Sequence, residues 1–402
     1  MTLSQIIGFS RKKKFFTSFE APNKYKKNDC ADYIFNRFKK LKNKHLKQLN
    51  SIKKFQFDQV STDDVIKLIK DLDKKSSCGI TDIPVGVIKH SAITLSKPIC
   101  HLLNYCLTNN CLPNEWKFAI VTPLYKQKGE LSDFNNYRGI SVLSPFSKLF
   151  ERILQRQILN YFDVNKLFNN SQHGFRAGFS CETALHELIS KWRNNMNKGL
   201  LNLALFVDFK KAFDYVNSDL LLIKLYCYGF SYDSIKLIAN YFYDRKQMVK
   251  YQTSLSSPSS ILLGVPQGSL IGPLFFLIFI NDLAFDFVDD ENLELFADDT
   301  TVSVSGANIP EVVSNLEIDV YKLLDWSDHN CLAINWSKTF LMLISNNKKS
   351  TIFPSSILTN SISISVVTNF KLLGVFIDSE LSFKENILKI SAKVHATLFS
   401  LK

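Results

Sequence analysis

The chain has 402 residues, of which 46% are hydrophobic and 21% are charged, a composition typical of a globular protein and not of a disordered one. All of the net charge of +12 lies in the first 54 residues, which hold 15 Lys and Arg against 3 Asp and Glu. A secretory signal is not expected, because no apolar stretch follows Arg11–Lys14. The longest apolar run, Ile271–Ile280, is about half of a ~20-residue membrane span.

The eight cysteines contain no Cys-x-x-Cys pair. Cys100, Cys106 and Cys111 lie close together in the sequence, but their spacing is not that of a zinc site. We therefore expect buried free thiols in a reducing, intracellular compartment.

The N-terminal third is predicted to be mainly helical. Apolar residues recur at helical spacing among lysines, which predicts a basic amphipathic helix; they are Ile34, Phe38, Leu41, Leu49 and Ile52. A second helix is expected over 61–72, with Ser61 or Thr62 as its cap. A third is expected over 85–107.

From residue 116 onward, strands are expected to alternate with helices. The expected strands cover 118–124, 201–207, 331–335 and 340–344, with a hairpin over 293–304 that turns at Ala297, Asp298 and Asp299. The expected helices cover 145–162, 218–228, 233–243 and 309–326, and one more begins near Ser269. This mixture predicts an α+β fold in which an antiparallel core sheet carries helices.

Three acidic residues follow strand-like segments. Asp208 comes directly after the apolar run 201–207, and Asp298 and Asp299 occupy the tip of the predicted hairpin. Converging carboxylates would repel one another unless cations lay between them, and Mg²⁺ is a natural partner for carboxylates and phosphates. Two such ions suit phosphoryl transfer. An isolated Asp-Asp pair is otherwise a common turn.

The order of nine short strings resembles the reverse transcriptases of non-LTR retrotransposons, the LINE-type elements, and jockey-like elements in particular. In chain order the strings are GITDIP (79–84), WKFAIVTPLYKQKG (116–129), NNYRGISVL (135–143), QHGFRAGFS (172–180), FVDFKKAFDYV (206–216), GVPQGSLIGPLFFLIFINDL (264–283), FADDT (296–300), CLAINWSKT (331–339) and FKLLGVFID (370–378).

The resemblance implies a right-hand polymerase fold with fingers and palm. We expect a basic arm over 1–57, a fingers-like region over 58–200, a palm over 201–345, and the palm end and start of a thumb over 346–402. The thumb is then absent or incomplete, and the chain is expected to be a fragment of a longer element protein.

The resemblance also implies roles for named residues. Asp208, Asp298 and Asp299 would be catalytic and would bind metal, with help from the backbone carbonyl of Phe209. Lys338 would act as a general acid toward pyrophosphate, unless it is an ordinary exposed lysine.

Nucleotide binding is expected from a second set of residues. Arg138, assisted by Lys126, would hold the phosphates. Gln267 would contact the nucleotide in a turn where Gly268 allows close approach. Phe213 would lie under the sugar and exclude a 2′-hydroxyl, or it would be a core aromatic.

Two further residues receive structural interpretations. Asp214 is expected to support a local turn or a helix start. His173 is expected to be structural or to face the primer and template.

The implied function is RNA-directed DNA synthesis with two Mg²⁺ ions, for which Mn²⁺ is a substitute. An RNA template, a DNA primer and deoxynucleoside triphosphates would be the partners, in the nucleus during integration and without a membrane; the oligomeric state is not predicted. The alternatives are a catalytically weak or dead remnant that only binds nucleic acid, and an intron-maturase-like protein.

The basic arm has four alternative interpretations. Its lysines would neutralise phosphates of RNA or DNA, or Arg11–Lys14 would serve as a nuclear import signal. A basic amphipathic helix can also lie on a membrane surface, or it can pack on the fingers with its charged face in water.

Overall fold

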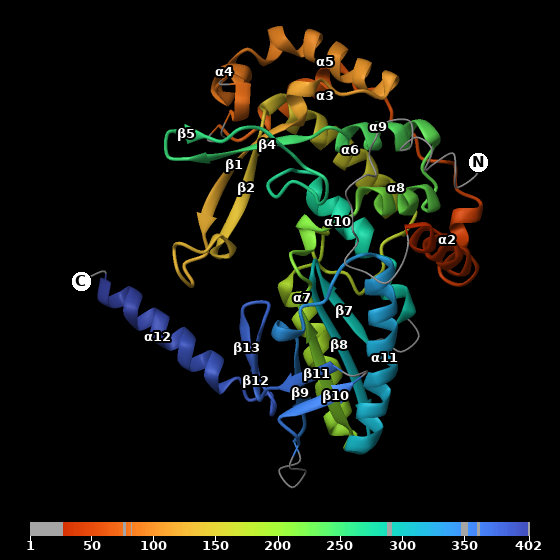
Figure 1. Cartoon of the computed structure of the whole chain (residues 1–402), viewed down its shortest axis with the longest axis vertical. Helices are drawn as coiled ribbons and strands as arrows, with labels where there is room; N and C mark the ends of the chain where they lie inside the picture. Colours follow the sequence, from red (N-terminus) through yellow and green to blue (C-terminus); the bar gives the residue numbers. More distant parts are fainter. Residues whose placement is uncertain are drawn as a thin grey trace. The chain divides into compact units, whose positions relative to one another are not determined.

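The computed structural model (Figure 1) describes residues 27–74, 78–81, 83–287, 292–346, 353–359 and 362–400. Arg11–Lys14 and Asp82 lie outside the described residues. The chain forms two compact units that interleave along the sequence. Unit 1 comprises residues 1–168 and 211–279, and unit 2 comprises residues 169–210 and 280–402.

Unit 1 is mostly helical. Its helices are α2 (Lys27–Lys44), α3 (Thr62–Lys70), α4 (Val85–His90), α5 (Ala92–Asn109), α6 (Pro145–Val164), α8 (Ser218–Cys227), α9 (Tyr232–Phe242) and α10 (Gly272–Ile280), whose last residue reaches unit 2. The predicted cap of α3 is confirmed, because Ser61 and Asp64 form a reciprocal capping box. The single helix expected over 85–107 is two, because Ser91 adopts a non-helical backbone conformation between them.

The first helix is packed into unit 1. Ile34, Phe38 and Leu41 are buried, and the ring of Phe38 lies edge-on to Tyr228 with 4.8 Å between ring centroids. The helix ends at Lys44, so the prediction that it extends to Ile52 is wrong. A separate turn of 3₁₀-helix, Lys47–Asn50, follows it.

Unit 1 also holds a small sheet. Its strands are β1 (Phe118–Tyr125), β2 (Tyr137–Leu143), β4 (Lys246–Tyr251), β5 (Ser254–Leu255) and β6 (Ser259–Ser260). The order is β2-β1-β4-β5, with β6 paired to β4; β1 runs antiparallel to β2 and parallel to β4. The loop between β1 and β2 is exposed to solvent, and Phe134 at its tip is 91% exposed.

Unit 2 is built on a six-stranded sheet. Its strands are β3 (Leu201–Val207), β7 (Leu293–Phe296), β8 (Asp299–Gly306), β9 (Phe340–Ile344), β10 (Ser356–Thr359) and β11 (Ile362–Val366), in the order β10-β11-β9-β3-β8-β7. A two-stranded sheet of β12 (Asn369–Leu372) and β13 (Val375–Asp378) follows. The helices are α7 (Cys181–Asn197), α11 (Ile309–His329) and α12 (Lys384–Ser400). Every strand pair of the larger sheet is antiparallel except β9 with β11.

Both faces of the central strand are covered. Leu188 and Trp192 of α7 join a buried cluster with Ala204 and Phe206 of β3, and α11 packs against β3 and β8. Every residue of β3 is buried, as its continuous apolar run predicts. Figure 1 shows the two helices flanking the sheet. The predicted α+β class with an antiparallel core sheet is confirmed.

The strand expected over 331–335 is absent from the described structure. Cys331 has a φ of +56°, and the backbone N–H of Leu332 turns back to the carbonyl of Ser327. A single bridge between Phe209 and Ile334 is all the sheet pairing in this segment. The segment contains the expected apolar residues, but its backbone turns back onto the end of α11 and makes no continuous pairing with a strand.

In the described parts of the chain, no helix combines the length and apolar character needed to cross a membrane. All eight cysteines are free thiols, but only Cys30, Cys106 and Cys227 are buried, so the prediction of burial is wrong for the other five.

Candidate active site

The three aspartates of the sequence prediction meet at one edge of the unit 2 sheet. Val207, the last residue of β3, pairs with Thr300 of β8. Asp208 therefore leaves the sheet beside Asp299, the first residue of β8, which closes the hairpin with Phe296. The antiparallel register of β3 with β8 is what brings residues 208 and 299 together.

The hairpin turn that carries Asp298 is held by the segment before α7. Ala297 has a φ of +56°, and its N–H donates to Oε1 of the buried Gln172 over 2.9 Å. The same oxygen accepts the N–H of Gly174 over 2.7 Å. A Cβ on Gly174 would collide with the backbone nitrogen of Ala297, so this position requires glycine.

The electrostatics of the turn indicate a concentration of negative charge. Burial raises the pKa of Asp299 to about 6, and the charges of Asp298 and Asp208 add to the rise. Asp299 keeps contact with solvent, but its carboxyl group also faces protein and two like charges. A cation bound among these oxygens would relieve that repulsion.

Asp208 is oriented by a residue that the sequence analysis did not single out. Nδ2 of Asn335 donates to Oδ2 of Asp208 over 2.8 Å, and the N–H of Asn335 donates to the Asp208 carbonyl over 2.7 Å. The backbone N–H of Asp208 donates to Oγ1 of Thr339 over 3.3 Å. Asn335 lies inside the string CLAINWSKT, which carries part of the resemblance, but no local pattern indicates its contact with Asp208.

The other predicted residues of unit 2 occupy neighbouring positions. Lys338 is exposed in the short 3₁₀ turn Trp336–Lys338, directly after Asn335. Phe209 is buried, and its ring lies edge-on to Trp326 with 6.3 Å between centroids.

In unit 1, Gln267 and Gly268 lie in a turn that approaches the backbone of β2 closely; their predicted contact with a nucleotide stays a prediction. The carbonyl of Gln267 accepts the N–H of Ser141 over 2.6 Å, and its Nε2 donates to Oδ1 of Asp214 over 2.7 Å. Gly268 has a φ of +111°, and a Cβ there would lie 2.5 Å from the Ser141 carbonyl oxygen. Asp214 thus supports the turn at Gln267, 53 residues further along the chain, and not the local turn of its structural interpretation.

Phe213 and the two cations of the predicted nucleotide site also lie in unit 1. The ring of Phe213 stacks on Phe276 with 4.4 Å between centroids and is half-buried, which leaves one part in contact with solvent. Arg138 is exposed on β2. Lys126 follows β1, and its Nζ donates to the carbonyl of Asn135 over 2.9 Å.

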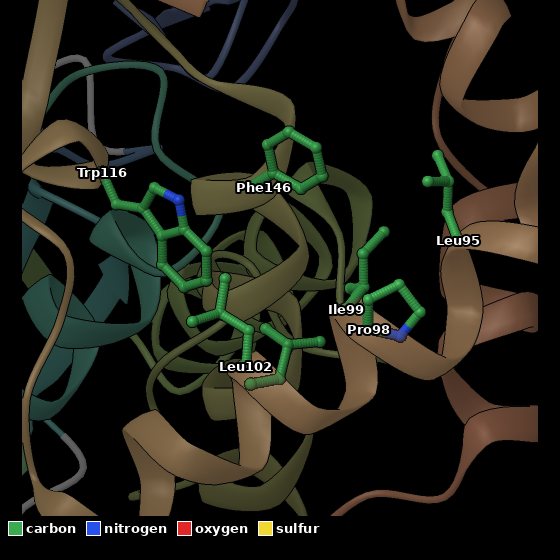
Figure 2. Close-up of a pocket in the computed structure, with 7 residues that line it drawn as sticks. Leu95, Pro98, Ile99, Leu102, Trp116 and Phe146 are labelled. Atoms are coloured by element: carbon green, nitrogen blue, oxygen red, sulfur yellow. The ribbon is translucent and has the colours of Figure 1, made fainter.

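A pocket of about 220 Å³ in unit 1 is not a candidate for this chemistry. Its lining is apolar and comes from α5, the 3₁₀ turn Asn114–Lys117 and the start of α6. Figure 2 shows Leu95, Pro98, Ile99, Leu102, Trp116 and Phe146 around it. These side chains offer no group that could ionise or bind a metal.

Comparison with known proteins identifies the family of the chain. Residues 126–377 match the family model described as reverse transcriptase (RNA-dependent DNA polymerase). This match covers more than half of the chain, so the chain belongs to the reverse transcriptase family. The resemblance to non-LTR retrotransposon proteins is likewise confirmed.

Three relatives illustrate the range of similarity. The chain is 26% identical over 349 residues to a probable RNA-directed DNA polymerase from transposon BS of Drosophila melanogaster, which covers 85% of this chain and 38% of the relative. It is 26% identical over 295 residues to the RNA-directed DNA polymerase from mobile element jockey of the same species, covering 72% and 32%. A putative COX1/OXI3 intron 1 protein of Saccharomyces cerevisiae is 33% identical over 137 residues, covering 34% and 15%. The chain thus spans about a third of the length of these two transposon relatives.

Proposed function

We propose that the chain is an RNA-directed DNA polymerase that adds deoxynucleotides to a DNA primer. The observation that carries the proposal is the meeting of Asp208 with the Asp298–Asp299 turn at one sheet edge, where burial and the neighbouring carboxylates raise the pKa of Asp299. Family membership and the transposon relatives support the same reaction class.

The donor set of this edge fits a hard divalent cation. Asp208, Asp298 and Asp299 offer carboxylate oxygens only, which Mg²⁺ prefers over the nitrogen and sulfur ligands that zinc accepts, and Mn²⁺ would substitute. The Phe209 carbonyl is a further candidate ligand. When bound, two such ions would activate the primer hydroxyl and neutralise charge on the phosphates.

The protein's own residues have separate tasks in this proposal. Asn335 orients the Asp208 carboxylate, and Gln172 fixes the turn that presents Asp298. Lys338 is proposed to give a proton to the leaving pyrophosphate. RNA template, DNA primer and deoxynucleoside triphosphates are the proposed partners.

The nucleotide-binding tasks are proposed for unit 1. Arg138 and Lys126 would contact phosphates, since a guanidinium binds them through paired hydrogen bonds. Gln267 and Gly268 would form the backbone platform under the nucleotide, and the Phe213 ring would exclude a 2′-hydroxyl.

Primer extension on an RNA template tests the proposal. Wild-type protein is expected to extend an annealed DNA primer with deoxynucleotides and Mg²⁺, and Asp208→Ala or Asp298→Ala is expected to abolish extension. Glu317→Ala, an exposed acidic residue on α11, is the matched control and should extend normally. Extension that survives either aspartate substitution would contradict the site assignment.

Two alternatives are distinguished with the same protein preparation. A catalytically dead remnant would bind the RNA–DNA hybrid in a filter assay and never extend it. The similarity to a yeast intron protein keeps an intron-maturase-like function as a second candidate. That function predicts faster splicing of a bound intron, which Asp298→Ala would leave unchanged.

A further inference from the structure

A second cluster of metal-binding side chains lies in unit 2, apart from the aspartates. His173, Glu187 and Glu294 each offer one ligand atom, and these atoms lie within 4.8 Å of one another. His173 precedes α7, Glu187 is on α7, and Glu294 is on β7. From the sequence, His173 is expected to be structural or to face the primer and template, and no local pattern connects it with either glutamate.

One ring nitrogen of His173 is paired with a hydroxyl group and the other faces the glutamates. Nδ1 of His173 lies 2.8 Å from Oγ1 of Thr183, and that hydroxyl also lies 2.9 Å from the carbonyl of Ser180. When the hydroxyl donates its single hydrogen to Ser180, Nδ1 carries the ring hydrogen and donates to Thr183. The neutral ring of that tautomer has its lone pair on Nε2, the nitrogen that faces the glutamates and that a metal ion would bind.

The distances from Nε2 to the two glutamates distinguish a charged hydrogen bond from shared binding of a metal ion. Nε2 lies 3.4 Å from Oε2 of Glu187 and 3.3 Å from Oε2 of Glu294. A charged N–H···O bond would be about 2.7–2.9 Å long. Two N and O ligands of one tetrahedral zinc ion, each about 2.0–2.2 Å from the metal, lie ~3.4 Å apart.

The burial of the cluster makes these distances unusual without a cation. The His173 side chain is fully buried, and within the described ranges neither its Nε2 nor Oε2 of Glu294 has a hydrogen-bond partner. The Glu294 side chain is 14% exposed. A buried polar atom without a partner costs free energy, and a divalent ion would satisfy both atoms at once. Glu187, with a side chain 53% exposed, would give the ion a route from solvent.

We propose that His173, Glu187 and Glu294 bind one zinc ion, whose fourth tetrahedral position would be filled by water from the solvent beside Glu187. The ion would join the loop before α7, α7 itself and β7. The N–H of His173 already donates to the carbonyl of Leu295 over 2.8 Å, and β7 leads into the turn with Asp298. Zinc would therefore stabilise the base of the catalytic hairpin, whether or not the chain polymerises DNA.

Zinc binding to the full chain tests this proposal directly. Metal-free protein in excess Mg²⁺, which occupies the aspartate edge, is titrated with Zn²⁺ while bound metal and the melting temperature are measured. We expect one tightly bound zinc per chain and a higher melting temperature. Glu187→Gln is expected to weaken zinc binding by at least ~100-fold. It removes a ligand of the metal, and mutation of a residue that only hydrogen-bonds to a ligand already lowers metal affinity by about 10–100-fold.

The controls separate this site from adventitious zinc binding. Glu182→Gln and His186→Gln change exposed residues of the same helix and are expected to bind zinc like the wild type. When Co²⁺ replaces zinc, the protein should show no thiolate-to-cobalt charge-transfer absorption, which would appear if cysteines bound the ion. Binding that survives Glu187→Gln, or that shows this sulfur absorption, would overturn the proposal, as would the absence of a bound zinc.

Discussion

Asn335 is the residue on which the position of Asp208 depends most clearly. Its side chain and backbone both bond to Asp208, from a segment 127 residues further along the chain. Removal of the amide would free the carboxylate to rotate while it kept its charge. Asn335 is therefore a positioning residue, since it acts through Asp208.

We expect Asn335→Ala to lower kcat for nucleotide addition by about 10–100-fold, because small displacements of a reacting group have effects of that size. KM for the deoxynucleotide should change little. Steady-state primer extension measures both constants. Asn315→Ala removes a hydrogen bond to Ser305 elsewhere in unit 2 and is the control. A matching loss in the control would mean that unit 2 is merely destabilised.

Asp299 gives the site a pH dependence that can be measured without substrate. Its folded pKa of about 6 exceeds the unfolded value of 3.8, so the native state binds more protons between these values. Its contribution to stability is therefore lost as pH rises from about 4 to above 6 in metal-free protein. Solvent exposure limits the effect to about 1 kcal/mol or less. Asp299→Asn should flatten the profile from chemical denaturation, and an unchanged profile would contradict the assigned pKa.

Phe213 tests the proposed selection of deoxynucleotides. Its ring stacks on Phe276 but remains half-buried, so a smaller side chain would open space without exposing the core widely. We expect Phe213→Val to improve ribonucleotide incorporation relative to deoxynucleotides by about tenfold or more. Competing single-nucleotide incorporations measure the ratio. A ratio equal to that of the wild type would identify Phe213 as a core aromatic only.

At the scale of elements, periodicity predicted segments whose structure is set locally. The apolar run of β3 and the helical stripe of α11 each identify their element without reference to distant residues. The segment 331–335 has the composition of a strand, yet the N–H of Asn335 bonds to Asp208 and not to a ladder. Tertiary partners determined its backbone, and no local pattern reveals them.

The candidate site divides along the same line. The aspartates, Gln267 and Phe213 could be proposed from the sequence, because they lie in the motifs that carry the resemblance to non-LTR reverse transcriptases. Gln172 could not, since its role depends on a contact with Ala297, 125 residues away. The sequence does not indicate the His173 cluster for the same reason, because its three side chains come from a loop, a helix and a strand.

In unit 1, a buried polar network joins α6, α9 and the segment before α10. Glu151 accepts hydrogen bonds from the Tyr241 hydroxyl over 2.7 Å and from the Leu270 N–H over 2.8 Å. Arg245 lies over the Tyr241 ring at 4.6 Å. Because all three side chains are buried, loss of one leaves the others without compensation.

We expect Glu151→Ala to lower the free energy of unfolding of unit 1 by about 3–5 kcal/mol, since it leaves Arg245 as an uncompensated buried charge. Urea denaturation followed by tryptophan fluorescence and circular dichroism measures the change. Glu115→Ala alters an exposed glutamate of the same unit and should stay within about 0.5 kcal/mol of the wild type. A Glu151 variant as stable as that control would show that the network contributes nothing net.

At the scale of the whole molecule, the excess charge and the fold are linked through α2. The sequence places all of the net charge in the first 54 residues, and the described part of that segment is not a free arm. Ile34 and Phe38 are buried in unit 1, while Lys39, Lys40 and Lys47 are exposed. Deletion of the segment would therefore remove core residues together with the charge.

Substitution of Lys39, Lys40 and Lys47 by glutamate tests the charge without disturbing that core. If these lysines contact phosphates, RNA affinity should fall, and the slope of log K against log salt should shrink by about 0.7 for each lost contact. Filter binding at several salt concentrations gives the slope. An unchanged slope would leave these three lysines as a solvated surface.

RNA-directed DNA synthesis is tested by the sequence of the DNA that the chain makes from an RNA template of mixed composition. Wild-type chain, a DNA primer, deoxynucleotides and Mg²⁺ should yield DNA complementary to the RNA, and Asp298→Ala should yield none. Product from wild type that is not complementary to the template, or complementary product from Asp298→Ala, would contradict RNA-directed synthesis at the aspartate edge.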